Sequence, residues 1–503
     1  MALIVCLYVG AALWLALYGV NALGLTALFL RQRGHHRQAR RTSPISPPQW
    51  PLVTVQLPVY NEQQVVRRLT DAVARLDYPR DRLHIQVLDD STDGTTELAA
   101  ERVAYWQSRG RWITLHHRVD RVDYKAGALC AALTATPGEF IAIFDADFVP
   151  PPGWLKRALQ PFFEPGGKRI GLVQTRWSHL NAEYSLLTRA QALALDGHFG
   201  IEQPARHWAG LLFNFNGTAG IWRRGCIEST GGWRGVTLSE DLDLSYRAQL
   251  QGWTFRYLPD VTAPAEIPPL MPAFKRQQFR WAKGSIQCAR LLGPALLRAP
   301  ISRWQKLQGV AHLTSYLVHP LMVLLLLVTL PMSLGDGRIF HHLPLAWLGI
   351  AGLGAPLLYA AAQWSLYPGT PWWRRLAWLP LLAILGTGIA ASNTRAVIEG
   401  LSGLRSPFQR TPKTGLERRG GHWEGGAAER IDIDVTTWVE LALSVYALVA
   451  GTLALVHGNW IGVFFLAIYG LGFAWVGGAT LWEAHAWRPR QQSHRPLQQV
   501  ERL

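Results

Sequence analysis

Long apolar runs at both ends of the chain are the feature that most limits its fold. Residues 2–30 carry no charged side chain, and this run exceeds the roughly 20 residues that a helix needs to cross a bilayer. A signal peptide is the alternative, but the run is too long and no basic residue precedes it. The positive-inside rule places the basic segment that follows in the cytoplasm. Its side chains include Arg31, Arg33, His35, His36, Arg37, Arg40 and Arg41.

Further apolar spans occupy the last two hundred residues, and their parity limits the topology. The tail after residue 487 carries four arginines, so it is also expected in the cytoplasm and the number of crossings must be odd. The span Leu376–Ala391 is the shortest and runs into polar residues, so we interpret 378–404 as a helix at the membrane surface. Five crossings remain. Besides the N-terminal run they are His312–Met332, Leu345–Leu366, Trp438–His457 and Trp460–Leu481.

Composition argues against other classes of protein. The 503 residues carry a formal net charge of +16, but no nucleic-acid recognition motif appears among them. The basic clusters lie beside apolar spans, as in cytoplasmic loops of membrane proteins, so no nucleic-acid partner is expected. The four cysteines are scattered without Cys-x-x-Cys spacing, which disfavours a disulfide framework or a zinc site.

The segment between the apolar runs is predicted to be a soluble α/β domain. Short apolar runs recur along it, and between the first two lies 63–76, which has apolar residues at helical spacing. Strands that alternate with helices predict a mostly parallel sheet. The predicted strands are Val53–Leu57, His84–Leu88, Phe140–Phe144, Ile170–Val173 and Phe255–Leu258.

Polar and acidic residues follow three of these strands directly. Tyr60 and Glu62 follow the first, Asp90 the second, and Asp145 and Asp147 the third. Ligands of open α/β sheets bind beyond the carboxyl ends of the strands. Two carboxylates this close repel each other unless a cation lies between them, and a hard divalent ion commonly bridges carboxylate to phosphate. We therefore expect a metal that neutralises a diphosphate leaving group, against the alternative of a solvated loop or a helix cap.

Three later motifs have both a structural and a chemical interpretation. Lys125 is either a surface charge or a phosphate ligand. Glu240 and Asp241 follow a serine, so they are either first-turn acids of a helix or the source of a general base that takes the proton of a sugar hydroxyl. Arg280 and Trp281 suit an interfacial helix, or else a guanidinium clamp on diphosphate beside an indole face for a sugar ring.

In this order the motifs resemble the processive family-two glycosyltransferases, which include cellulose, hyaluronan, chitin and mannan synthases. The resemblance covers residues 51–281. The stretch Phe215–Gly220, followed by Gly231-Gly232-Trp233, is similar to cellulose-synthase-like glucomannan and glucan synthases. Residues 408–413, Phe-Gln-Arg-Thr-Pro-Lys, are similar to the gating loop Phe-x-Val-Thr-x-Lys of the family, except that Arg410 replaces the valine.

The resemblance implies an α/β GT-A (Rossmann-like) catalytic fold, inversion at the anomeric carbon, and Mg²⁺ or Mn²⁺ as cofactor. Metal and donor would be held by Asp145 and Asp147, and Asp241, beside Glu240, would be the base. Trp281 would stack on the acceptor sugar beside Thr218. The nucleotide-sugar donor would be contacted by Tyr60, Glu62, Asp90, Lys125 and Arg280, and by Phe408, Thr411 and Lys413 of a gating-like loop that closes over the nucleotide.

These expectations describe an integral protein of a bacterial inner membrane with its catalytic domain in the cytoplasm and an α-helical transmembrane domain. The predicted parts are a transmembrane helix at 1–30, the GT-A domain at 51–265, interfacial helices with the Arg-Trp motif at 266–304, and transmembrane helices at 305–503 that include the surface helix and gating-like loop at about 376–437.

The leading functional hypothesis is a synthase that polymerises hexose from UDP-glucose or GDP-mannose into a β-glucan or mannan. In an extended form of this hypothesis, the protein also exports the polymer between its own helices. The alternative is transfer of one sugar to a membrane lipid, as in relatives of ceramide glucosyltransferase. The gating-like loop around Thr411 favours the polymer. A transporter or scaffold is a third hypothesis, and the scarcity of charges in the late spans disfavours it. The sugar, the linkage, partner subunits and the oligomeric state stay open.

Overall fold

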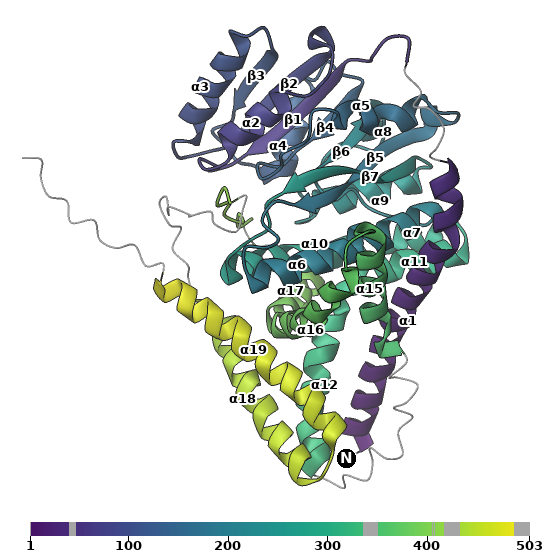
Figure 1. Cartoon of the computed structure of the whole chain (residues 1–503), viewed down its shortest axis with the longest axis vertical. Coiled ribbons are helices and arrows are strands. Elements are labelled where there is room, and N and C mark those ends of the chain that lie inside the picture. Colours follow the sequence, from purple (N-terminus) through teal and green to yellow (C-terminus); the bar gives the residue numbers. More distant parts are fainter. Residues whose placement is uncertain are drawn as a thin grey trace, which may run out of the picture.

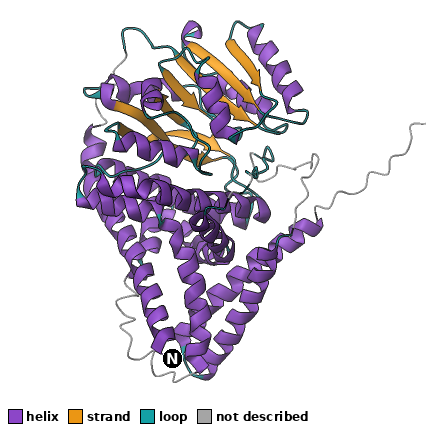
Figure 2. Cartoon of the chain, turned by 180° about the vertical axis from the view of Figure 1, so that it is seen from behind, coloured by secondary structure: helices purple, strands orange, loops and turns teal. Residues whose placement is uncertain are grey.

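The computed structural model describes residues 2–39, 47–334, 351–404, 406, 408–416 and 433–486. An α/β domain adjoins a bundle of long helices (Figure 1), and its sheet is orange in Figure 2. The predicted basic residues Arg40 and Arg41, the arginine-rich tail and the first part of the predicted span Leu345–Leu366 lie outside the described residues, as do the side chains of residues 35–39.

A seven-stranded mixed sheet organises the α/β domain, in the order β3-β2-β1-β4-β6-β5-β7. Strand β6 is antiparallel to both neighbours, and the other four strand pairs are parallel, so the predicted mostly parallel sheet is correct. Strands β3 and β6 escaped prediction because β3 mixes histidines with apolar residues and β6 is very short. The strands are β1 Val53–Val59, β2 Leu83–Asp89, β3 Trp112–His117, β4 Phe140–Ile143, β5 Ile170–His179, β6 Gly220–Arg223 and β7 Thr254–Ala265.

Both faces of the central strands are buried, which explains their nearly continuous apolar sequence. Val55 of β1 packs on one face with Leu69 of the helix that follows it. On the other face, Ile141 of β4 belongs to a cluster with Leu129 and Trp222. Burying each such side chain stabilises the fold by about 1.5–3 kcal/mol. The sheet is thus a fixed platform from which the loops at its edge project.

Helices cover the sheet on both faces (Figure 1). The α-helices of this domain are α2 Val66–Ala74, α3 Thr95–Gln107, α4 Tyr124–Leu133, α5 Trp154–Leu159, α6 Leu186–Gly197, α7 Gln203–Trp208, α8 Arg224–Ser229 and α9 Glu240–Leu250. The short elements are the 3₁₀ turns η1 Arg80–Arg82, η2 Gln160–Phe163 and η3 Gly167–Arg169, and the π-helical turn η4 His198–Glu202.

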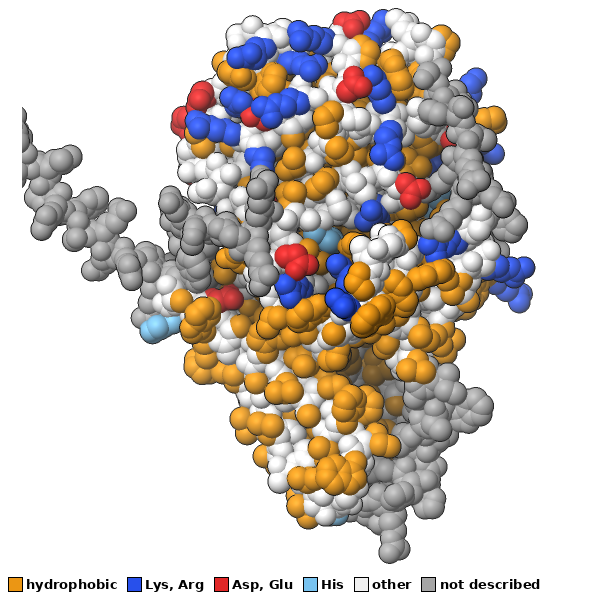
Figure 3. Space-filling model, viewed as in Figure 1, with side chains coloured by type: hydrophobic (Ala, Val, Ile, Leu, Met, Phe, Trp, Pro, Cys, Tyr) orange, Lys and Arg blue, Asp and Glu red, His pale blue; other side chains and the backbone are white. Residues whose placement is uncertain are grey.

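Four helical segments of the described chain are long and apolar enough to cross a membrane, and each coincides with a predicted span. Apolar side chains cover the visible part of this bundle, whereas charged side chains gather on the α/β domain (Figure 3). The predicted span Leu345–Leu366 contributes the 13-residue helix α15 Gly354–Leu366. The four segments are Ala2–Gly34 within α1 (Ala2–Ala39), η5 Ser315–Leu317 with α12 Val318–Leu334, α18 Val435–Val456 and α19 Trp460–Ala486.

The predicted surface helix over 378–404 is a bent pair of helices. After η6 Trp372–Trp378, α16 Leu379–Gly388 meets α17 Ala390–Ser402 at a 45° bend, and the pair raises the candidate crossings from four to five. Gly388 lies against α19, where an added Cβ would be 2.3 Å from the carbonyl oxygen of Gly472. Only glycine permits this approach of the two helices.

Helix α10 Met271–Arg298, followed by α11 Arg303–Leu313, connects the two parts of the molecule. The buried Lys275 places its Nζ 2.8 Å from Glu440 Oε2 of α18, and the buried Lys283 places its Nζ 2.7 Å from Glu399 Oε2 of α17. Breaking one partner of a buried ion pair costs about 3–5 kcal/mol. The helix that carries Arg280 is therefore firmly fixed to the apolar helices.

Candidate active site

Three neighbouring parallel strands end at the same edge of the sheet. The order β2-β1-β4 brings Asp90, Glu62 and Asp145 together there, although they are far apart in sequence. The convergence follows from the shared direction of the strands, because their carboxyl ends must meet at one edge. The predicted gathering of acids beyond the strand ends is therefore what the fold produces.

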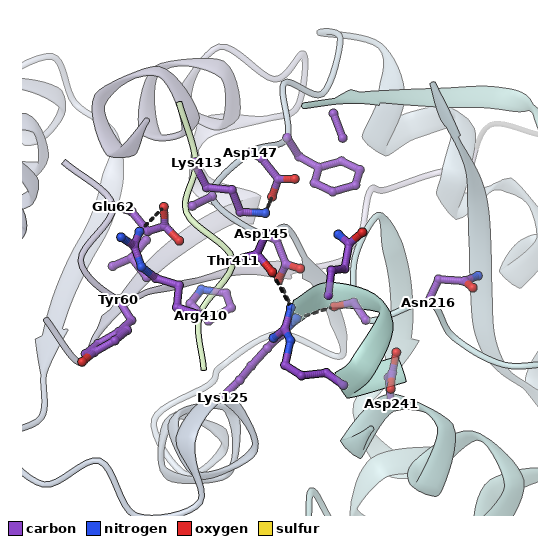
Figure 4. A pocket seen from close by; sticks show the side chains of 18 of the residues that line it. Tyr60, Glu62, Lys125, Asp145, Asp147, Asn216, Asp241, Arg410, Thr411 and Lys413 are labelled. Atoms are coloured by element: carbon purple, nitrogen blue, oxygen red, sulfur yellow. Dashed lines mark hydrogen bonds and ion pairs between the residues drawn. The ribbon is translucent and has the colours of Figure 1, made fainter. Parts of the chain in front are cut away.

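These residues line one pocket, which α9, α10 and the loop 408–416 complete. In Figure 4, Tyr60 and Arg410 lie on one side of the pocket, Asn216 and Asp241 on the other, and Asp145 between them. Thr218 is the only predicted site residue that does not line the pocket. The predicted residues that do are Tyr60, Glu62, Asp90, Lys125, Asp145, Asp147, Glu240, Asp241, Arg280, Trp281, Phe408, Thr411 and Lys413.

Thr218 lies behind the pocket wall and is fully buried. Its Oγ1 accepts a hydrogen bond of 2.9 Å from the backbone N–H of Asp145. This position differs from the predicted contact with an acceptor sugar, because no part of the side chain reaches the pocket. Thr218 instead holds the backbone that presents Asp145.

Lysines face both acids of the Asp-x-Asp motif. Lys125 Nζ lies 2.5 Å from Asp145 Oδ1, and Lys413 Nζ lies 2.9 Å from Asp147 Oδ1. Across the described residues, no group of three or more His, Cys, Asp or Glu side chains could hold a metal by itself. The two carboxylates nevertheless fit a hard divalent ion, since their oxygen atoms are its preferred donors and phosphate oxygens can complete the shell.

Lys125 occupies the first turn of α4 and points into the pocket. Its Nζ also donates to the carbonyl oxygen of Gly217 at 2.8 Å and lies 3.9 Å from Glu240 Oε1. Burial lowers the pKa of Lys125, but Asp145 and Glu240 outweigh it and the pKa is raised. Lys125 is thus a permanent positive charge beside the Asp-x-Asp motif.

Asp241 lies in the first turn of α9, where a helix N-terminus normally favours a carboxylate. Burial and the neighbouring Glu240 act in the opposite direction and raise the pKa of Asp241 to about 7. A carboxyl group with a pKa near neutrality can both accept and release a proton at physiological pH. Such a shift at a pocket wall is typical of a general base.

The gating-like loop lies across the edge of the pocket and is held by side chains of the α/β domain. Arg410 Nη1 lies 3.1 Å from Glu62 Oε2, and Arg280 Nη2 donates to Thr411 Oγ1 at 3.0 Å. Burial raises the pKa of Glu62 to about 8, although Arg410 and Lys413 oppose the rise. The loop therefore brings two cations to the strand ends.

Glu266 secures the far end of this loop and was not predicted. It accepts hydrogen bonds from the backbone N–H groups of Thr414 at 2.8 Å and Gly415 at 2.9 Å, and from the hydroxyl of Thr414. The residue follows β7, but no other sequence signal marks it. Its partners lie about 150 positions away, so only the folded chain reveals the contact.

Two arginines of the segment before α4 were also missed. Arg118 binds both oxygens of Asp90, with Nε–Oδ1 and Nη2–Oδ2 distances of 2.7 and 2.6 Å. The guanidinium of Arg121 lies 3.3 Å from the centre of the Tyr60 ring. A basic segment after a strand is a weak signal by itself, because such residues are usually solvated.

Comparison with known proteins decides the class of this domain. A model described as glycosyltransferase-like family 2 matches residues 48–284. This segment, just under half of the chain, is therefore similar to family 2 glycosyltransferases. The family predicted from the motifs is confirmed, and so is the fold class of a GT-A-like α/β domain joined to apolar helices.

Individual relatives add detail about the glycosyltransferase domain. Over 263 residues the chain is 41% identical to a probable glucomannan 4-β-mannosyltransferase 6 of Oryza sativa subsp. japonica, a match that covers 51% of this chain and 46% of the relative. A solved mannosyltransferase of Pyrobaculum calidifontis, in complex with GDP-Man and Mn²⁺, is 20% identical with a TM-score of 0.46, covering 78% of this chain and all of that one. The structure of S. aureus TarS residues 1–349 with UDP is 15% identical with a TM-score of 0.39, and the match covers 74% of this chain and 99% of that one.

Proposed function

We propose that the chain is a membrane-bound, inverting glycosyltransferase that transfers hexose from a nucleotide sugar to a growing β-linked mannan or glucan. The observation that carries the proposal is the convergence, in one pocket of a family 2 domain, of an acid pair, two cations and a carboxyl group of raised pKa. These are the groups that glycosyl transfer to a hydroxyl requires.

The donor is bound by the side of the pocket that we name the donor wall: Tyr60, Glu62, Asp90, Lys125, Asp145, Asp147, Arg280 and the loop 408–416. Asp145 and Asp147 would hold Mg²⁺ or Mn²⁺, which would supply positive charge to neutralise the diphosphate. Lys125 and Arg280 stabilise the negative charge that develops on the leaving diphosphate, because both are cationic and already in place. The nucleoside contacts Tyr60 and Asp90.

The acceptor is bound by the opposite side, the acceptor wall: Asn216, Gly217, Glu240, Asp241 and Trp281. An acceptor hydroxyl attacks the anomeric carbon of the donor, and the bond from that carbon to the diphosphate oxygen breaks. Asp241 takes the hydroxyl proton as the new bond forms, and the electron pair leaves with the nucleoside diphosphate. Trp281 supports the acceptor ring.

A polymer is the favoured acceptor. The loop 408–416 contacts other residues of the donor wall through Arg410 and Lys413. Such contacts suit a loop that closes over the donor each time a sugar is added to a polymer. The name of the plant relative, a glucomannan mannosyltransferase, favours mannose as the transferred sugar. Export of the product by this chain is a further part of the proposal.

Transfer to a lipid is the second candidate, and one observation favours it. Leu187 of α6 and Phe274 of α10 form a shared apolar cluster with Leu385 of α16 and Val476 of α19. The domain that forms the pocket therefore packs directly on the apolar helices. An amphiphilic acceptor could reach it from a membrane.

The proposed location is a bacterial inner membrane with the glycosyltransferase domain in the cytoplasm. Four candidate spans support a membrane protein, and the basic residues that follow residue 30 support the orientation. Cysteine accessibility in intact cells checks the orientation, since Cys130 is exposed on α4.

The deciding experiment incubates the full chain in detergent with Mg²⁺ or Mn²⁺ and a panel of radiolabelled nucleotide sugars. Digestion with linkage-specific hydrolases then identifies the product. A hydrolase-sensitive polymer supports the proposal, a lipid-extractable single-sugar product supports the second candidate, and absence of transfer from every donor contradicts both. Asp241→Asn separates an enzyme from a transporter or scaffold, because only an enzyme depends on that carboxylate.

A further inference from the structure

Helices α10 and α11 carry positive charge that no acid of their own balances. They lie between the sheet and the long apolar helices (Figure 1), and they contain eight lysines and arginines but no aspartate or glutamate. No acidic residue occurs anywhere between Glu266 and Asp336. A stretch with only one sign of charge attracts a partner of the opposite sign.

Three of these cations have partners or places inside the molecule. Lys275 is paired with Glu440 of α18. Lys283 is paired with Glu399 of α17. Arg280 lines the pocket. The pocket and the ion pairs that fix α10 therefore leave the charges at the end of α10 and on α11 unexplained.

Arg298 and Arg303 lie where α10 ends and α11 begins, and both are exposed. Among the residues that the structure describes, neither guanidinium has a hydrogen-bond, ion-pair or ring partner. Lys306 holds the two helix ends together, because its Nζ donates to the carbonyl oxygen of Leu297 at 2.7 Å. We name Arg298, Arg303 and Lys306 the basic patch.

The helix dipole explains only part of the basic patch. Arg298 occupies the last turn of α10, where a cation is favoured. Arg303 is the first residue of α11, and a helix N-terminus disfavours a cation. A second arginine at this place therefore has no purpose in the stability of its own helix.

Apolar side chains flank the basic patch and face outward. Trp304 is 50% exposed and Leu307 is 59% exposed. The opposite face of the same helices is already packed, since Leu296 and Leu313 are buried. Arginine beside exposed tryptophan and leucine is typical of a helix at the boundary between lipid tails and headgroups.

Hydrogen bonds fix α11 beside two candidate membrane spans. The helix ends two residues before the span Ser315–Leu334. Gln308 Nε2 donates to Asn21 Oδ1 of α1 at 2.7 Å. The hydroxyl of Tyr18, also in α1, donates to the carbonyl oxygen of Thr314 at 2.7 Å. The basic patch is therefore held next to the apolar helices, within reach of the lipid that would surround them.

We propose that the basic patch, together with Trp304 and Leu307, is a docking surface for anionic phospholipids of the membrane. The two guanidinium groups bind lipid phosphates, for which their planar pairs of N–H donors are suited. The apolar side chains enter the boundary with the lipid tails. This partner is additional to the proposed function and does not depend on which sugar is transferred.

The test measures lipid binding to the full chain in neutral detergent by native mass spectrometry, with phosphatidylglycerol or phosphatidylcholine added. The unmodified protein should prefer phosphatidylglycerol, and the preference should shrink as rising salt screens the charges. Each basic residue near an anionic lipid surface strengthens binding about fivefold. Replacing both arginines by alanine, Arg298→Ala with Arg303→Ala, should therefore lower the preference about fivefold for each arginine. Arg298→Lys with Arg303→Lys should keep most of it.

Arg80→Ala with Arg109→Ala is the matched control, because it removes two exposed arginines near α3, away from the apolar helices (Figure 1). It changes the net charge equally and should leave the lipid preference unchanged. Melting temperatures in detergent check that every variant folds. No preference in the unmodified protein, an equal loss in the control, or displacement of the lipid by inorganic phosphate at constant ionic strength would overturn the proposal. Because binding is measured without transfer, absence of transfer overturns only the proposed function.

Discussion

The donor wall and the acceptor wall face each other across the pocket, yet they are held in different ways. On the donor wall, Asp147 and Glu62 are paired with cations of a loop more than two hundred positions away, Lys413 and Arg410. On the acceptor wall, Asn216 contacts the buried Gln174 and the half-buried His198, which belong to the same domain.

The difference separates replaceable contacts from permanent ones. A lysine beside a carboxylate can be exchanged for a metal ion or repositioned on a phosphate, because each partner gains an equivalent charge contact. A buried amide network has no such substitute and is costly to disturb. The donor wall is therefore expected to rearrange when ligands bind, whereas the acceptor wall is expected to keep its shape. Each prediction below tests one side of this comparison.

The largest effect is expected at the proposed base. Asp241→Asn removes proton acceptance while keeping the size of the side chain, and general-base catalysis contributes about 10²–10⁴-fold. The kcat of transfer should fall by that factor, and calorimetric binding of nucleoside diphosphate should be nearly unchanged because the donor wall is intact. A protein that retains full activity would show that another group accepts the proton.

Loss of a proposed metal ligand on the donor wall should have the next largest effect. Asp147→Asn keeps the shape of the side chain but removes a negative charge, so we expect the Mn²⁺ concentration for half-maximal activity to rise on the order of a hundredfold. Titration of activity with Mn²⁺ after chelation measures this. Unchanged metal dependence would assign the ion to other ligands, and complete insensitivity of the unmodified protein to chelation would remove the metal from the proposal.

The two walls also differ in what the amino-acid sequence could predict. Asp90, Asp145 and Asp147 stood out because they follow apolar strands, and strand direction alone brings them to one edge. The ion pairs Arg410–Glu62 and Arg118–Asp90 could not be predicted, because an ion pair between residues distant in sequence leaves no local sequence pattern. Thr218 was assigned to the acceptor through resemblance alone, and the fold places it behind Asp145.

The pH dependence of transfer should report the raised pKa of Asp241. Burial and Glu240 raise this pKa to about 7, and the base acts only when ionised. The kcat/KM for the donor, which reports the ligand-free enzyme, should therefore fall about tenfold per pH unit below 7 and level off above it. A pH series at donor concentrations below KM measures the profile. A flat profile from pH 5 to 8 would mean that burial does not tune this carboxylate.

A smaller effect is expected where the acceptor wall touches the base. Gly217 has a φ of 79°, which costs other residues about 1–3 kcal/mol, and its added Cβ would press on Asp241. Gly217→Ala should lower kcat several-fold and lower the melting temperature, while nucleoside diphosphate binds as before. Gly232→Ala is a suitable control, since Gly232 also has a positive φ of 69° but has open space around it. Equal loss of kcat in both variants would attribute the effect to strain rather than to the base.

The smallest effect is expected for the replaceable pair of the donor wall. Arg410→Val restores the residue of the gating loop that this one resembles and removes the ion pair with Glu62, which is worth about 0.5–1 kcal/mol where solvent reaches one partner. If the pair must open to admit the donor, the donor KM should fall about threefold at constant kcat. Because burial raises the pKa of Glu62 to about 8, the ionised fraction of its carboxylate increases as pH rises through 8, and the effect should grow over the same range. A donor KM that rises instead would mean that Arg410 itself binds the donor. The contacts of the donor wall would then be retained on ligand binding, as we expect for the acceptor wall.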